Sequence, residues 1–202
     1  MFIDSHAHLD MEDFDADRDQ VIKRALHGGV SCVVTIGIDL ASSIKAIEIA
    51  EEYPFVYASV GYHPHNAKEA TSAELKKLSA LASNPKVVAW GEIGLDFFRR
   101  HSPPDKQVEV FELQLDMAFE LGLPVIIHDR EAHGDLVSIL KKRKRAYRGV
   151  IHCFSGDYDF AMSLIEMGFH ISFPGTVTYK NAGDTQRAAS QIPLERLLVE
   201  TD

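Results

Sequence analysis

Short apolar and β-branched runs alternate with segments of helical periodicity along the whole chain. Val30–Ile36 is a continuous run without charged residues, as expected for a strand buried on both faces. The runs predict strands at 2–6, 30–36, 56–60, 87–90, 125–128, 149–154, 170–173 and 197–200. Between them the periodicity predicts helices at 18–27, 40–53, 136–144, 160–167 and 181–191, with two more beginning after Thr71 and at Pro104.

Local signals support several of these helix boundaries. Asp39 can cap the second helix, and Thr71 and Glu74 have the spacing of a capping box. In the helix that begins at Pro104, Leu115 and Phe119 belong to one apolar stripe.

Strands that alternate with helices pair in parallel, because each crossover returns the chain in the same direction. Eight repeats favour a closed α/β barrel of the TIM (β/α)₈ type over an open doubly wound sheet, and no Gly-rich dinucleotide motif follows the first strand. A closed barrel normally has a helix after its eighth strand, and none is encoded here. We therefore expect one barrel domain over 1–202, truncated at its carboxyl end and lacking the elements after the eighth strand.

Composition is that of a globular protein: 202 residues, 46% of them hydrophobic, with two cysteines in apolar runs. Cys32 and Cys153 are interpreted as reduced, buried side chains. We see no secretory signal and no apolar stretch near the roughly 20 residues of a membrane span, so we expect a cytoplasmic protein without membrane contact. No feature of the sequence indicates an obligate protein partner. The net charge of −9 argues only weakly against nucleic acid as substrate, because bound cations can reverse the local field.

Residues that commonly bind metals close several of the predicted strands. Carboxyl ends of barrel strands meet at one face, so residues far apart in sequence can share one pocket. We predict that seven side chains meet there: His6, His8, His63, Glu92, His128, His152 and Asp202.

Two of these positions carry a specific argument. His6 and His8 lie on the same side of an extended strand, because side chains alternate. Glu92 has apolar neighbours on both sides, so its carboxylate is predicted to be buried and must be paired or bound to a metal. In contrast, His27 ends a helix and His170 begins a strand at the opposite face, and both are interpreted as structural.

Imidazole and carboxylate ligands suit Zn²⁺, Mn²⁺, Fe or Ni better than Ca²⁺. Six candidate ligands exceed the three or four of a single catalytic zinc. We therefore predict two divalent ions, with Mg, Mn, Zn, Ni and Fe all open. Such sites activate water for attack on phosphorus or on a carbonyl carbon.

Six segments, in order along the chain, resemble the TatD family of metal-dependent deoxyribonucleases among the amidohydrolase-like barrels. They are Ile-Asp-Ser-His-Ala-His-Leu-Asp, Gly-Tyr-His-Pro-His, Gly-Glu-Ile-Gly-Leu-Asp-Phe, Pro-Val-Ile-Ile-His-Asp-Arg, Ile-His-Cys-Phe-Ser-Gly and Leu-Leu-Val-Glu-Thr-Asp. Many amidohydrolases have a carboxylated lysine where Glu92 stands here, which weighs against a dihydroorotase-like enzyme.

The resemblance implies a role for each ligand. One ion is bound by His6, His8 and Asp202, and the second by His128 and His152, with Glu92 bridging the two. Asp202 is also implied as the general base, and His63 as a phosphate-binding or proton-donating residue at the rim.

Substrate contacts are predicted in the loops at the same face. Arg99 and Arg100 follow the fourth strand and Arg130 follows His128, so all three could hold phosphates, and His65 lies beside His63. The basic run at 141–145 ends a helix at the far face and is interpreted as a solvated surface.

The leading hypothesis is a two-metal hydrolase acting on ester bonds, a DNase or 3′–5′ exonuclease whose substrate is DNA with single-stranded ends. One alternative is hydrolysis of another ester, such as D-aminoacyl-tRNA deacylation, by the same site. The other is an inactive metal-binding barrel, which the truncated end would explain.

Overall fold

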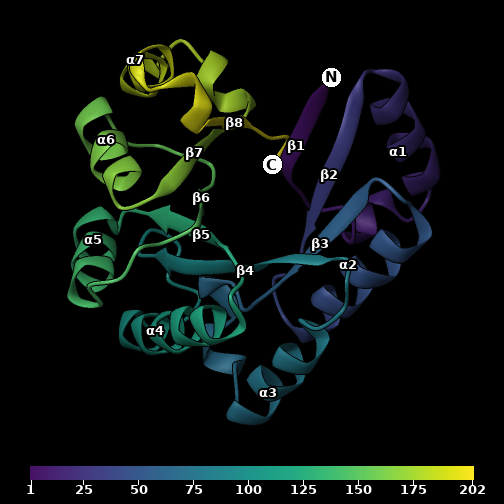
Figure 1. The fold of residues 1–202 in the computed structure, drawn as a ribbon, viewed down its shortest axis with the longest axis horizontal. Helices are drawn as coiled ribbons and strands as arrows, with labels where there is room; N and C mark the ends of the chain where they lie inside the picture. Colours follow the sequence, from purple (N-terminus) through teal and green to yellow (C-terminus); the bar gives the residue numbers. More distant parts are fainter.

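All 202 residues are described by the computed structural model, in which eight parallel strands follow one another in sheet order from β1 to β8. The strands are β1 (Phe2–Ala7), β2 (Val30–Ile36), β3 (Val56–Val60), β4 (Val87–Asp96), β5 (Val125–Arg130), β6 (Gly149–Ile151), β7 (Phe169–Phe173) and β8 (Leu197–Val199). The helices around them are α1 (Arg18–His27), α2 (Leu40–Glu52), α3 (Ser72–Leu81), α4 (Pro104–Leu121), α5 (His133–Lys142), α6 (Tyr158–Glu166) and α7 (Gly183–Gln191) (Figure 1). This is the predicted TIM-type (β/α)₈ barrel, nearly closed.

The predicted helix caps are present. The Asp39 side chain accepts a hydrogen bond from the Ser42 backbone N–H, and Thr71 and Glu74 form both bonds of a capping box. Several boundaries differ from the sequence prediction. The largest differences are in β4, which continues to Asp96 instead of ending at Trp90, in α5, which begins at His133 instead of Leu136, and in β6, which ends at Ile151 instead of Phe154.

Buried apolar side chains form two groups. The larger contains 40 residues and fills the space between the sheet and the helices, and the smaller consists of Ile36, Ala89, Ile126 and Val150 inside the barrel. Phe119 is not part of this core: it is 60% exposed, although the apolar stripe of α4 predicted it to be inside.

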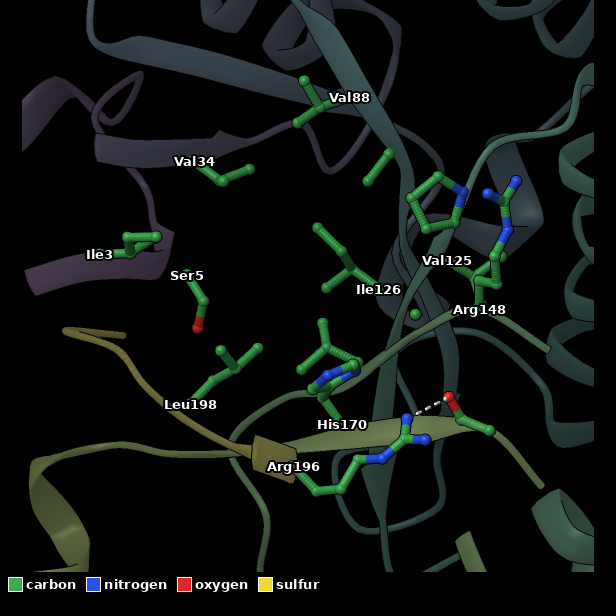
Figure 2. A pocket seen from close by; sticks show the side chains of 15 residues that line it. Ile3, Ser5, Val34, Val88, Val125, Ile126, Arg148, His170, Arg196 and Leu198 are labelled. Atoms are coloured by element: carbon green, nitrogen blue, oxygen red, sulfur yellow. Dashed lines mark hydrogen bonds between the residues drawn. The ribbon is translucent and has the colours of Figure 1, made fainter. Parts of the chain in front are cut away.

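A cavity of about 510 Å³ lies inside the barrel at the amino ends of the strands (Figure 2). Val34, Ile126 and Leu198 line it, and His170 and Arg196 lie among its polar residues. No carboxylate or cysteine is present in its wall. His170 is therefore at the opposite end from the predicted ligands, as expected.

Side chains join the last strand to the first. Both carboxylate oxygens of Asp4 accept hydrogen bonds from Thr201, from its backbone N–H at 3.1 Å and from its hydroxyl at 2.6 Å, and the Ser5 hydroxyl donates to the Val199 carbonyl at 3.0 Å. The end of the chain therefore runs beside β1 (Figure 1), and this position brings Asp202 close to His6.

The basic run at 141–145 lies at the end of α5, away from the predicted ligands. Lys141, Lys142 and Lys144 are exposed, but Arg143 and Arg145 are only partly exposed, which corrects the sequence interpretation for these two. Arg143 pairs with Glu112 and Asp116 of α4, and Arg145 also pairs with Asp116. Elsewhere in the chain, no helix combines the length and apolar character needed to cross a membrane.

Candidate metal centre

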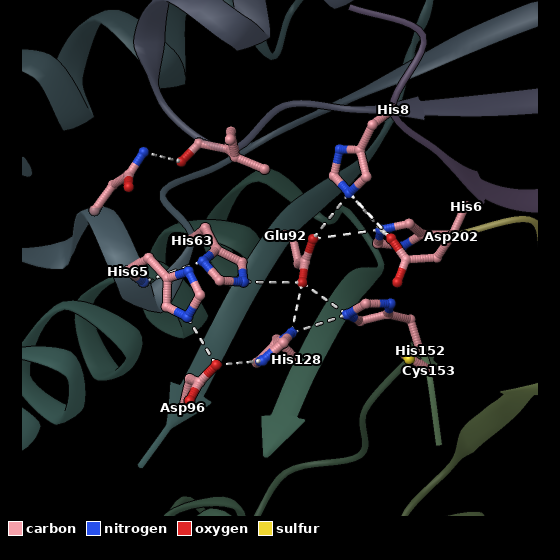
Figure 3. Close-up of polar contacts among 12 residues, drawn as sticks. His6, His8, His63, His65, Glu92, Asp96, His128, His152, Cys153 and Asp202 are labelled. Carbon is pink, nitrogen blue, oxygen red and sulfur yellow. Dashed lines mark hydrogen bonds and ion pairs between the residues drawn. The ribbon is translucent and has the colours of Figure 1, made fainter. Parts of the chain in front are cut away.

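The seven predicted ligand residues meet at the carboxyl ends of the strands (Figure 3). They come from six different strands or from the residues that follow them, as the barrel argument predicts. Six of them line a cavity of about 230 Å³ together with His65 and Asn66; these six are His8, His63, Glu92, His128, His152 and Asp202. His6 lies beneath, with no exposed surface.

Glu92 occupies the centre of the cluster because β4 is irregular there. The register with β5 shifts between Trp90 and Ile93, and a shift of this kind turns a side chain away from the regular alternation. A Cβ atom on Gly91 would lie 2.6 Å from the Cβ of Ile126, so only glycine fits before Glu92. The strand was predicted to end at this point, whereas it bulges and continues.

The Glu92 carboxylate contacts five imidazoles. Its Oε1 atom lies 2.7 Å from His152 Nε2, 2.8 Å from His128 Nδ1 and 3.2 Å from His63 Nε2. On the other side, Oε2 lies 3.3 Å from His6 Nε2 and 3.8 Å from His8 Nε2. The two oxygens therefore face two separate groups of histidines.

Asp202 completes the group on the β1 side. Its Oδ1 atom is 3.3 Å from His8 Nε2 and 3.6 Å from His6 Nε2, and these two nitrogens are 3.2 Å apart. His63, in contrast, is 8% exposed, so it lies within the cluster, deeper than the rim position expected for it.

The electrostatics of the cluster favour an ionised carboxylate. Burial alone would raise the pKa of Glu92, but the imidazoles of His152, His63 and His128 hold it well below its ordinary value. Burial lowers the pKa of His128, whereas hydrogen bonds with Asp96 and Glu92 outweigh burial and raise it to about 9.

The side chains fit a divalent metal ion. Three overlapping groups bring their ligand atoms within 4.8 Å of one another, namely His6 with His8 and Glu92, His63 with Glu92 and His128, and His6 with His152 and Asp202. Imidazole nitrogens that face one another at 3.1–3.2 Å next to carboxylates are suited to share a cation.

Two buried carboxylates behind the cluster were missed by the sequence interpretation. Asp96 has no exposed surface, and its Oδ2 lies 2.7 Å from His65 Nε2 and 3.4 Å from His128 Nε2. Glu200 accepts a hydrogen bond from the Cys153 backbone N–H at 2.6 Å, and its Oε1 lies 3.8 Å from His152 Nδ1. The period-two alternation of an unbroken β4 could have indicated Asp96, but the strand was predicted to stop before it.

The three predicted arginines lie outside this cavity. Arg99 and Arg100 are exposed in the loop after β4, and the Arg100 Nε–H donates to the Phe97 carbonyl at 2.7 Å. Arg130 lines a neighbouring depression of about 490 Å³ with Glu131, His133 and Ser155. The structure therefore places these guanidinium groups around the ligand cluster and not within it.

A TIM-type barrel that gathers imidazoles and carboxylates at the carboxyl ends of its strands has the architecture of a metal-dependent hydrolase. The chain belongs to the family described as TatD related DNase, whose model matches residues 3–202. It is thus a metal-dependent hydrolase that acts on ester bonds.

Individual relatives agree with this assignment. An uncharacterized metal-dependent hydrolase, YabD of Bacillus subtilis, is 43% identical over 100% of this chain and 80% of its own length. The 3′–5′ ssDNA/RNA exonuclease TatD of Erwinia tasmaniensis is 40% identical over 98% of this chain and 78% of its own. The crystal structure of the TatD homologue YJJV from Escherichia coli superimposes with a TM-score of 0.94 at 34% identity, covering 100% of this chain and 78% of that one.

Proposed function

We propose that this hydrolase is a nuclease that removes nucleotides from the 3′ ends of single-stranded DNA or RNA. The observation that carries the proposal is the convergence of imidazoles on the two oxygens of Glu92. The name of the Erwinia tasmaniensis relative, a 3′–5′ ssDNA/RNA exonuclease, supports the choice of substrate.

Two divalent ions are proposed, with their ligands divided between the two oxygens of Glu92. His6, His8 and Asp202 would hold one ion, and His128 and His152 the other. Bound divalent ions lower the pKa of water and offset negative charge on phosphodiester oxygens.

Asp202 is proposed as the proton acceptor for the attacking water. Its hydrogen bond with His8 opposes the effect of burial and holds the pKa of Asp202 at about 2, so the carboxylate is ionised at neutral pH. Its Oδ1 atom faces the same side of the cluster as His6 and His8.

His63 is proposed to donate a hydrogen bond or a proton to the phosphodiester. Its Nδ1 accepts the backbone N–H of His65 at 3.0 Å, so the neutral ring carries its proton on Nε2, which faces Glu92 Oε1 at 3.2 Å in the wall of the cavity. Burial lowers the pKa of His63, which favours this neutral form.

Outside the ligand cluster, four side chains are proposed to contact substrate phosphates: His65, Arg99, Arg100 and Arg130. Hydrolysis of another ester, such as D-aminoacyl-tRNA deacylation, could use the same ligands. The names of the relatives favour the nuclease.

The test is a nuclease assay on the metal-loaded protein with a 5′-labelled single-stranded oligonucleotide. We expect stepwise shortening from the 3′ end, abolished by a chelator, and a loss of activity on the order of 100-fold or more for Glu92→Gln, because both ligand groups share this carboxylate. Glu120→Gln, an exposed carboxamide change on α4, is the matched control. Intact oligonucleotide after incubation with metal-loaded wild type would contradict the proposal.

A further inference from the structure

Phe98 is a large apolar side chain exposed at the catalytic face. It lies in the loop after β4 and is 58% exposed. The guanidinium of Arg130 covers its ring, with Cζ 4.3 Å from the ring centroid. The exposed part of the ring contributes little to the core and is open to contact with a ligand.

Strand pairing places Arg130 near the ligand cluster, and Phe98 lies against Arg130. Asp96 is paired with Arg130 between β4 and β5, and the Phe97 backbone N–H donates to the Arg130 carbonyl at 2.9 Å. Arg130 thus stands two strand residues beyond His128, a distance of about 6–7 Å, and Phe98 lies beside Arg130 in the turn that follows Asp96. This is the spacing at which a nucleotide next to the scissile bond would lie.

A second phenylalanine shows what this arrangement looks like when it is only structural. Phe119 is 60% exposed, and Arg145 Cζ lies 4.2 Å from its ring centroid. Arg145, however, is paired with Asp116 at 3.0 Å, at the end of the barrel away from the ligands. Arg130 has no ion pair with any carboxylate, so its charge remains available for a phosphate.

Space for a ligand lies beside Arg130. The neighbouring depression of about 490 Å³ is lined only by polar side chains, Arg130, Glu131, His133 and Ser155. An exposed ring next to a free guanidinium and a polar depression matches the three parts of a nucleotide, which are a flat base, a phosphate and a sugar.

We propose that Phe98 and Arg130 form a nucleotide subsite, in which the base next to the scissile phosphodiester stacks on the exposed part of the Phe98 ring and Arg130 binds its phosphate. This inference rests on the proposed nuclease function. Stacking on an aromatic side chain accepts any base, so the subsite would hold single strands without selecting a sequence.

The experiment compares Phe98→Ala, Phe98→Tyr and the matched control Phe119→Ala. Two single-stranded oligonucleotides are used, one normal and one with reduced abasic residues at its last three 3′ positions. KM and kcat are measured with the metal-loaded enzymes, and binding of the labelled oligonucleotides is measured by fluorescence anisotropy in the presence of EDTA. Thermal unfolding confirms that each variant is folded.

Phe98→Ala is expected to raise KM and the dissociation constant for the normal oligonucleotide by about 5- to 100-fold, the value of one base–aromatic stack. Phe98→Tyr and Phe119→Ala should leave both unchanged, and Phe98→Ala should have no effect on the abasic oligonucleotide. Equal effects on both oligonucleotides, or none on either, would overturn the subsite. A wild type that binds DNA but never cleaves it contradicts the proposed function, while the binding measurements still decide on the subsite.

Discussion

At the scale of single residues, Asp96 is a buried carboxylate beside the cluster to which the proposed function gives no role. Its carboxylate has no exposed surface and lies between His65, which lines the cavity, and His128 of the cluster. The Gln107 side-chain amide holds the Asp96 backbone: its oxygen accepts from the Asp96 N–H, and its NH₂ donates to the Asp96 carbonyl. The Arg99 backbone N–H donates to Asp96 Oδ1. A carboxylate held so firmly can orient the ring of a metal-binding histidine without touching the metal.

Asp96→Asn is therefore expected to weaken metal binding by about 10- to 100-fold, because the amide no longer orients His128 as an anion does. Isothermal titration of the metal-free protein with Zn²⁺ or Mn²⁺ gives the affinity directly. Asp105→Asn, an exposed change in the first turn of α4, should leave it unaltered. An unchanged affinity in Asp96→Asn would show that Asp96 only supports the fold.

At the scale of elements, the contact between α4 and α5 shows how a charged run becomes part of the packing. Arg143 is largely buried and donates to the Glu112 carbonyl and to Asp116 Oδ2, at 2.9 and 3.0 Å. From the sequence alone these positions are predicted to be a solvated helix end, because the partner carboxylates are on another helix more than 20 residues away.

This contact predicts a dependence of stability on pH. Burial alone would raise the pKa of Asp116, but Arg143 and Arg145 hold it below the ordinary 3.8. A carboxylate with a lowered pKa stabilises the folded state above 3.8 and loses that contribution as pH falls through its folded value. Asp116→Asn should thus lower the free energy of unfolding at pH 7, and the difference should shrink below about pH 4 in urea titrations. A difference independent of pH would contradict the ion pair.

At the scale of the whole molecule, the ligand cluster ties together strands from both ends of the chain. His6 and His8 belong to the region of β1, Glu92 to β4, and Asp202 follows β8. Because β1 and β8 are joined mainly through Asp4 and Thr201, a metal bound by this cluster would also hold the two ends of the barrel together.

Metal loading should therefore raise the melting temperature, and a chelator should reverse the change. At a free metal concentration of 100 times the dissociation constant, the folded state gains about 2.7 kcal/mol. Scanning calorimetry with and without EDTA measures this shift, which Glu92→Gln should largely remove and Glu120→Gln should retain. An equal shift in Glu92→Gln would place the stabilising metal elsewhere.

Much of the fold could be predicted where the pattern is strong. Val30–Ile36 and Arg18–His27 have the predicted boundaries, because one is an unbroken apolar run and the other has a clear helical period between a polar loop and glycine. The prediction failed in β4, since Gly91 and Glu92 interrupt the apolar run while the strand continues through a bulge to Asp96.

The sequence by itself determined the barrel and the residues that gather at one end of it, because alternation sets the parallel topology and topology brings strand ends together. Only the tertiary structure decided the rest. It placed His63 inside the cluster, set Asp96 and Glu200 behind the histidines, and left Phe98 exposed beside an unpaired Arg130. These features depend on a register shift and on contacts between distant segments, which no local pattern of residues encodes.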